Sequence, residues 1–81
     1  MPRFYFDIED GARSIDEYGV MLADRKHVEL TAIRSLFDIA RDDPQVLSGS
    51  PMTISVRDAA GETIYRATLN LRAGWVTARE R

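Results

Sequence analysis

Hydrophobic and polar residues alternate at the start of the chain, between residues 3 and 8. Phe4, Phe6 and Ile8 fall on one face of an extended segment, and the residues between them fall on the other. Aromatic and β-branched side chains of this kind favour a strand that has one buried face. The pattern therefore predicts a half-buried strand over residues 3–8.

Two segments of turn-forming residues follow this strand, at 9–11 and at 16–19. They bound a short segment, 12–15, that we interpret as a partner strand, and they precede a second one at 20–22. We therefore expect the chain to open with a hairpin or a small three-stranded meander.

Apolar residues recur at helical spacing over residues 25–41, after Asp24, which is a good N-cap residue. Pro44 ends this pattern, and we expect residues 45–51 to form a loop. The apolar arc of the helix spans about half of its circumference, which is wider than the stripe of about 100° that a surface helix needs. Its members are Val28, Leu30, Ala32, Ile33, Leu36, Phe37, Ile39 and Ala40. Either the sheet wraps around this helix, or one edge of the arc meets another molecule.

Alternation returns after the helix and predicts two strands, 52–57 and 63–71, which a turn at 58–61 joins into a hairpin. Placing both apolar faces on the same side puts Val56 opposite Tyr65. A slip of one residue would turn the whole apolar set toward solvent, so the pattern fixes this register.

The order of strands, helix and strands predicts an α+β fold. We expect a two-layer sandwich in which one helix, at about 25–41, covers one face of an antiparallel sheet. Residues 1–72 should form a single domain. Residues 73–81 have no clear period, so we expect either a flexible tail or a tail that docks through Trp75 and Val76.

Composition narrows the function classes. The chain has 81 residues, 44% of them hydrophobic and 30% charged, which is typical of a folded domain with a thin core. It has no cysteine, which excludes disulfides and thiolate chemistry and favours a reducing, cytoplasmic location. No apolar run approaches the roughly 20 residues of a membrane span, so we expect no membrane partner. The net charge of −2 offers little attraction for nucleic acid.

Acidic residues near the start of the chain are the first candidates for chemistry: Asp7, Glu9, Asp10, Asp16 and Glu17. They could hold a divalent cation or supply a carboxylate pair for acid–base work. Their spacing does not fit the calcium-loop pattern, which places oxygen ligands at alternate positions. We therefore favour their interpretation as two solvated turns.

Other polar candidates are weaker. His27 is the sole histidine and lacks matched partners, so we expect an exposed surface residue. The loop 48–50, Ser-Gly-Ser, is followed by a strand rather than the helix of a phosphate cradle. Glu29 falls within the apolar arc, and we expect it to reach water. We predict no catalytic residue, metal, cofactor or small-molecule ligand, and we expect that the protein is not an enzyme.

Two surfaces are candidates for partner binding. The first is the exposed face of the sheet along the last two predicted strands, with Arg57, Arg66, Asn70 and Arg72. The second is a possible interface formed by two residues of the apolar arc and one of the tail: Leu30, Phe37 and Trp75.

Several segments together resemble an uncharacterised family of short bacterial proteins, a domain of unknown function that opens M-P-R-[FY]-[FY]-F-D-I-x-D-G. The segments are Met1–Ile8 with Asp10-Gly11, Asp16-Glu17-x-Gly19-Val20-x-Leu22-x-Asp24, Asp38–Asp42, and Val56-Arg57-Asp58-x-x-Gly61. The resemblance extends to about Leu71 and implies no activity, because these motifs are turns, a helix cap and core positions. Arg25-Lys26-His27 departs from the acidic or alanine-rich residues that are usual after the cap.

Three functions follow from these observations, in decreasing order of preference. The first is a non-enzymatic interaction or regulatory module that binds a protein partner or forms a homodimer. The second is a nucleic-acid-associated regulator that uses the arginine-bearing sheet face. The third is a metal-dependent enzyme that uses the acidic turns.

Overall fold

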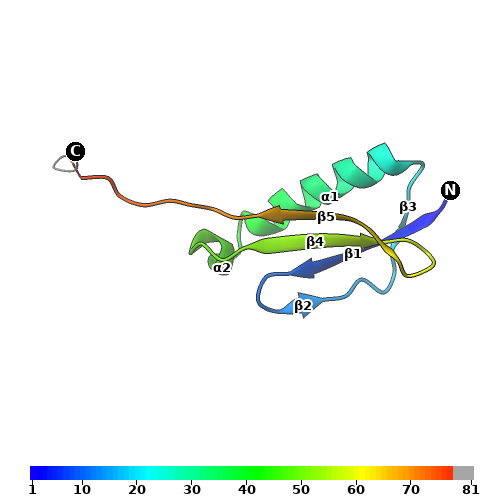
Figure 1. Cartoon of the computed structure of the whole chain (residues 1–81), viewed down its shortest axis with the longest axis horizontal. Helices are drawn as coiled ribbons and strands as arrows, with labels where there is room; N and C mark the ends of the chain where they lie inside the picture. Colours follow the sequence, from blue (N-terminus) through cyan, green and yellow to red (C-terminus); the bar gives the residue numbers. More distant parts are fainter. Residues whose placement is uncertain (78–81) are drawn as a thin grey trace.

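The computed structural model describes residues 1–77, so residues 78–81 of the predicted tail lie outside the described residues. Five strands and two helices follow one another within residues 1–77 (Figure 1). They are β1 (Arg3–Glu9), β2 (Arg13–Ser14), β3 (Val20–Met21), α1 (Arg25–Ala40), α2 (Pro44–Leu47), β4 (Met52–Arg57) and β5 (Thr63–Leu69).

The strands form one antiparallel sheet in the order β2-β1-β4-β5, and β3 also pairs with β1. The two short strands thus occupy opposite ends of the same edge of β1. Of the two arrangements predicted for the start of the chain, the hairpin is confirmed and the meander is wrong, because β3 pairs with β1 rather than with β2. The second predicted hairpin is also confirmed, and Val56 lies opposite Tyr65 as the hydrophobic pattern requires. At the other side of the sheet, β5 is an edge strand, and it ends at Leu69 rather than at Leu71.

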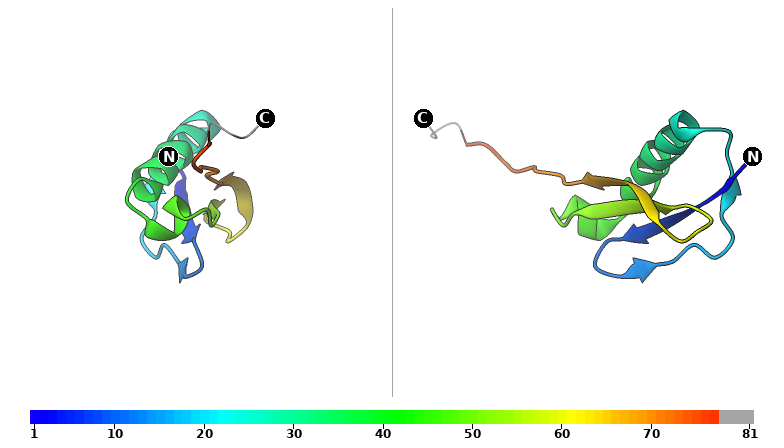
Figure 2. Two further views of the ribbon diagram at one scale, coloured as in Figure 1. Left: turned by 90° about the vertical axis from the view of Figure 1, so that its left-hand side faces the viewer. Right: turned by 45° about the vertical axis from the view of Figure 1, so that its right-hand side comes forward.

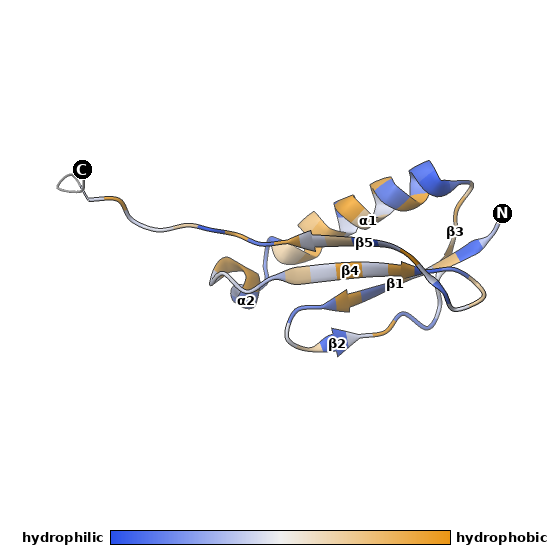
Figure 3. Cartoon of the chain, in the orientation of Figure 1, coloured by the Kyte–Doolittle hydropathy of each residue, from blue (hydrophilic) through white to orange (hydrophobic). Residues whose placement is uncertain are grey.

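The helix α1 lies across one face of the sheet, against β4 and β5, which confirms the predicted two-layer α+β fold (Figure 2). Figure 3 shows α1 changing from hydrophilic residues at its start to hydrophobic residues toward its end, and hydrophobic residues alternating with hydrophilic ones along the strands. The core joins four residues of α1 to three of β4, with one residue each from β1 and α2. Its members are Val28, Ala32, Leu36, Ala40, Met52, Ile54, Val56, Phe4 and Val46.

The start of α1 follows from its cap. The Asp24 carboxylate accepts a hydrogen bond of 3.0 Å from the backbone N–H of His27, which would otherwise lack a partner. The helix ends at Ala40, one residue before the predicted end, and Arg41 forms its C-cap. No helix among residues 1–77 has the length and hydrophobicity that crossing a membrane requires.

The segment 45–51, which we expected to be a loop throughout, begins with the short helix α2. Asp43 caps this helix by accepting a hydrogen bond of 2.9 Å from the N–H of Gln45, and Pro44 occupies the first turn. Its four residues are too few to show a helical period in the sequence. The helix matters for packing because it buries Val46 and leaves Leu47 exposed.

The sheet does not wrap around α1. Only the residues at a spacing of four, from Val28 to Ala40, are fully buried, whereas other members of the predicted arc reach solvent. Leu30 is 39% exposed, Phe37 is 55% exposed and Ile39 is 43% exposed. The alternative in which the sheet wraps around the helix is therefore wrong, and the alternative in which this exposed edge of the arc meets another molecule stays a prediction.

We expect the buried middle of β4 to dominate stability. Ile54 is fully buried, so Ile54→Ala should lower the free energy of unfolding by about 2–5 kcal/mol, since it leaves a cavity between α1 and the sheet. Urea denaturation followed by far-UV circular dichroism measures the change. Ile15→Ala is the matched control, because Ile15 is 49% exposed, and it should cost no more than about 0.5 kcal/mol. Equal losses in the two variants would contradict this core assignment.

Candidate functional site

Among residues 1–77, the most buried charged residue is Asp7 in the middle of β1, which is 7% exposed. Its carboxylate accepts hydrogen bonds from Nε of Arg57 at 2.7 Å and from a terminal guanidinium nitrogen at 3.1 Å. Arg57 lies on the neighbouring strand β4, diagonally across from Asp7, and its guanidinium also stands 5.1 Å from the centre of the Tyr5 ring. The pair therefore joins the two central strands on the face opposite α1.

Asp16 extends this pair into the loop between β2 and β3. Its Oδ2 accepts the backbone N–H of Phe6 at 3.0 Å, and its Oδ1 accepts those of Tyr18 and Gly19 at 3.0 Å each. Phe6 lies in β1 between the positions that pair with β3 and β2, so the carboxylate occupies the place of a missing strand partner. Arg57 donates a further hydrogen bond to the Asp16 carbonyl at 2.9 Å.

The turn of this loop requires glycine at position 19. Gly19 has φ of +69°, and a Cβ atom there would lie 2.8 Å from the Phe4 carbonyl oxygen. The close approach lets the loop turn directly against β1, and the Arg3 guanidinium donates to the Tyr18 carbonyl at 2.8 Å on the same side.

Both carboxylates of this network titrate at low pH. The Arg57 hydrogen bonds hold the pKa of Asp7 below its ordinary value, against the effect of burial. Burial would raise the pKa of Asp16, but the amides of Gly19, Phe6 and Tyr18 together with Arg57 outweigh it and lower that pKa. Both groups are therefore charged at neutral pH.

The interpretation of the acidic residues as solvated turns is wrong for Asp7 and Asp16, which are built into the sheet and its connecting loop. Alternation placed Asp7 on the solvent face, and the sequence gives no sign that Arg57, fifty residues later, lies beside it. Within residues 1–77 no three acidic or histidine side chains come together in a way that could hold a metal ion. Every buried side-chain nitrogen or oxygen in that part of the chain has a hydrogen-bond partner.

The predicted arginine-bearing face is largely occupied by contacts within the chain. Arg57 belongs to the ion pair with Asp7, and Nε of Arg66 donates to Oγ of Ser55 at 3.1 Å. Asn70 donates its side-chain amide to the Gly49 carbonyl at 3.1 Å, beyond the end of β5. Arg72 is exposed in the segment that follows. The four residues do not form one surface with free guanidinium groups.

The two isolated polar candidates on α1 lie at its surface. His27 is exposed, and its Nδ1 lies 2.7 Å from the capping carboxylate of Asp24. The amide and ring of His27 both lower the pKa of Asp24. Glu29 is exposed, as expected, although it interrupts the apolar arc.

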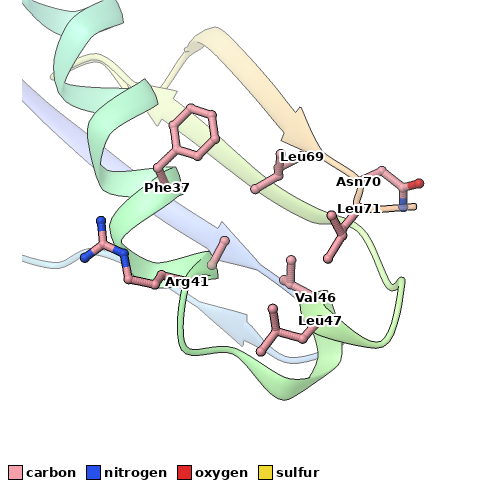
Figure 4. Close-up of a pocket in the computed structure, with 8 residues that line it drawn as sticks. Phe37, Arg41, Val46, Leu47, Leu69, Asn70 and Leu71 are labelled. Atoms are coloured by element: carbon pink, nitrogen blue, oxygen red, sulfur yellow. The ribbon is translucent and has the colours of Figure 1, made fainter. Parts of the chain in front are cut away.

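An open apolar groove lies where α1, α2 and the end of β5 meet (Figure 4). Its volume is about 250 Å³, and it is lined by Phe37, Ala40, Arg41, Val46, Leu47, Leu69, Asn70 and Leu71. Figure 4 shows the Phe37 ring directed from α1 toward Leu69 of β5, with Leu47 on the opposite wall. Phe37 and Leu47 are each more than half exposed, and Leu71 is 38% exposed. We call this feature the apolar groove.

Of the three predicted interface residues, the structure places only Phe37 in the apolar groove. Leu30 lies two helical turns earlier on the same face of α1. Trp75 lies in the segment after β5 and is 99% exposed. Sequence reasoning missed Leu47, because it treated α2 as a loop, and Leu71, because it extended the last strand across it.

The fold and the site define a small module in which one helix covers an antiparallel sheet and leaves an apolar groove at its end. The chain belongs to the family described as Domain of unknown function (DUF6894), whose model matches residues 3–70. Comparison with curated proteins and with solved structures found no match. The matched segment includes the network of Asp7, Asp16 and Arg57 and most of the groove. The bacterial origin that the resemblance implied stays a prediction.

We expect the Asp7–Arg57 pair to make stability depend on pH. Because the pKa of Asp7 is lower in the folded chain, its contribution is present above the unfolded pKa of about 4 and is lost as pH falls through the folded value. Asp7→Asn should lower the free energy of unfolding at pH 7 by about 1–3 kcal/mol. It should also flatten the decline of stability below about pH 4. Urea titrations at a series of pH values measure both effects.

Glu9→Gln is the matched control, because Glu9 lies on the same face of β1 and is exposed. It should leave stability at pH 7 within about 0.5 kcal/mol of the parent chain. If Asp7→Asn were as mild as Glu9→Gln at every pH, the ion pair would not stabilise the fold.

Proposed function

We propose that this protein is a non-enzymatic interaction module that binds a protein partner through the apolar groove. The observation that carries this proposal is the exposure of Phe37 and Leu47 on facing walls of a groove whose floor is apolar. Contiguous exposed apolar residues rimmed by polar ones are typical of protein-binding surfaces.

The free energy gained by covering the exposed apolar side chains of the groove supports a modest affinity for a partner. Full burial of a leucine or phenylalanine side chain is worth about 1.5–3 kcal/mol. Because Phe37 and Leu47 are a little over half exposed, covering each of them should contribute about 1–2 kcal/mol. An aromatic or aliphatic side chain of the partner would contribute again, as anchor residues do at interfaces.

The chemistry of the lining supports binding rather than catalysis. The groove contains one charged side chain, Arg41, and its other polar residue, Asn70, already donates to Gly49. A nucleophile or general acid–base pair would need further polar groups directed at one point. The proposal that the protein is not an enzyme rests on this lining.

A nucleic-acid-associated regulator that uses the arginine-bearing sheet face is the second candidate function. That role needs guanidinium groups that can reach phosphates, whereas Arg57 is paired with Asp7 and Arg66 contacts Ser55. A cytoplasmic location is part of the proposal, supported by the complete lack of cysteine.

A displayed library of random 12-residue peptides tests the proposal. Selection on the full chain should enrich peptides with a large apolar or aromatic residue, because such a side chain fills the groove. Leu47→Asp should weaken the enriched peptides at least tenfold in fluorescence polarisation, since it places a charge in the apolar wall.

Tyr18→Asp serves as the matched control, because Tyr18 is 83% exposed and lies in the β2–β3 loop rather than in the groove. It should leave the affinity unchanged. Peptides that bind both variants equally, or no enrichment at all, would refute the groove as the binding surface.

A further inference from the structure

We infer that the partner in the apolar groove is a second copy of this chain, whose segment 71–77 docks there with the Trp75 side chain inserted. This inference rests on the proposed function and names the occupant of the same groove. Two observations carry it: an exposed apolar segment that adjoins the groove, and the open edge of β5 beside the groove.

The segment after β5 contains large apolar side chains that are not buried within its own chain. It has no helix or strand from residue 70 to 77, and the figures show it leaving the body of the protein (Figures 1 and 2). Trp75 is 99% exposed and Val76 is 82% exposed. An isolated chain thus carries both an open apolar groove and a fully exposed indole.

The groove is of a size for one large side chain. Its volume of about 250 Å³ lies below the range of about 300–1,000 Å³ in which pockets for drug-sized ligands fall. Its walls, formed by Phe37, Leu47 and Leu69, can contact both faces of an aromatic ring.

The position of the segment explains why its acceptor is another copy. Leu71 lines the groove of its own chain, and the four residues from there to Trp75 extend about 13 Å along an extended backbone that leads away. Two copies related by a two-fold axis can exchange these segments, so that each chain gives one indole and receives one. The unpaired edge of β5 adjoins the groove and can accept backbone hydrogen bonds from the incoming segment.

The sole tryptophan makes the test direct, because its emission reports on this one contact. The full chain is examined from low to high concentration by tryptophan fluorescence and by analytical ultracentrifugation. We expect emission typical of an exposed indole at low concentration and a shift to shorter wavelength that follows the appearance of dimer. The dimer should be weak, because an interface this small belongs to the transient class.

Two variants locate the contact, and a third is the control. Leu47→Asp in the groove and Trp75→Ala on the segment should each raise the dissociation constant of the dimer at least tenfold. Trp75→Ala cannot disturb the fold through lost packing, because the residue is fully exposed, so it keeps the test valid if Leu47→Asp unfolds the chain. Tyr18→Ala removes an exposed aromatic residue far along the chain and should leave the dimer unchanged.

Three outcomes would overturn the inference. They are exposed-type emission at every concentration, shifted emission from a chain that sediments as a monomer (which means docking on the same chain), and a dimer that Trp75→Ala does not weaken. The peptide selection separates this failure from that of the proposed function. Peptides that need Leu47 would retain the groove as a binding surface for another protein, whereas their absence would remove both.

Discussion

The structure depends on how far one helix of sixteen residues can cover the sheet. Residues at a spacing of four along α1 meet β4 and complete the core, and β4 is buried at every second residue as a result. The apolar arc of α1 is wider than this contact, so Phe37 is left between the helix and the end of β5. The short helix α2 closes the end of the core with Val46 and adds Leu47 to the same open edge. The apolar groove is thus a direct consequence of a wide arc over a narrow sheet.

Away from α1, the network of Asp7, Asp16 and Arg57 completes the hydrogen bonding of the sheet. β1 needs hydrogen-bond partners along its outer edge, but β2 and β3 supply only two residues each. Asp16 fills the gap with its carboxylate, and Arg57 pairs with the Asp7 carboxylate and donates a hydrogen bond to the Asp16 carbonyl. These polar residues therefore serve the fold, and within residues 1–77 no three of the acidic or histidine side chains come together in a group that could hold a metal ion.

Hydrophobic periodicity and turn-forming residues were enough to predict the sheet, the helix and the register of Val56 with Tyr65. The reason is that each buried face requires apolar residues at a regular spacing in the sequence. They could not predict α2, whose four residues carry no period, nor the pairing of Asp7 with Arg57, which depends on strands fifty residues apart lying side by side. The groove was predictable only in part. The apolar arc of α1 is wider than the core needs, and this indicated that Phe37 would be exposed. Leu47 and Leu71 line the groove because of the short helix α2 and the early end of β5, and neither feature is visible in the hydrophobic pattern.

Isotope-filtered NMR on a mixture of labelled and unlabelled full chains tests the central claim most directly. One copy carries ¹³C in the methyl groups of Leu47 and Leu69, and the other carries none. The account predicts cross-peaks between these methyl groups and the indole protons of the unlabelled Trp75, at concentrations where a dimer is present. A dimer without such cross-peaks, or cross-peaks found only within a single chain, would contradict it.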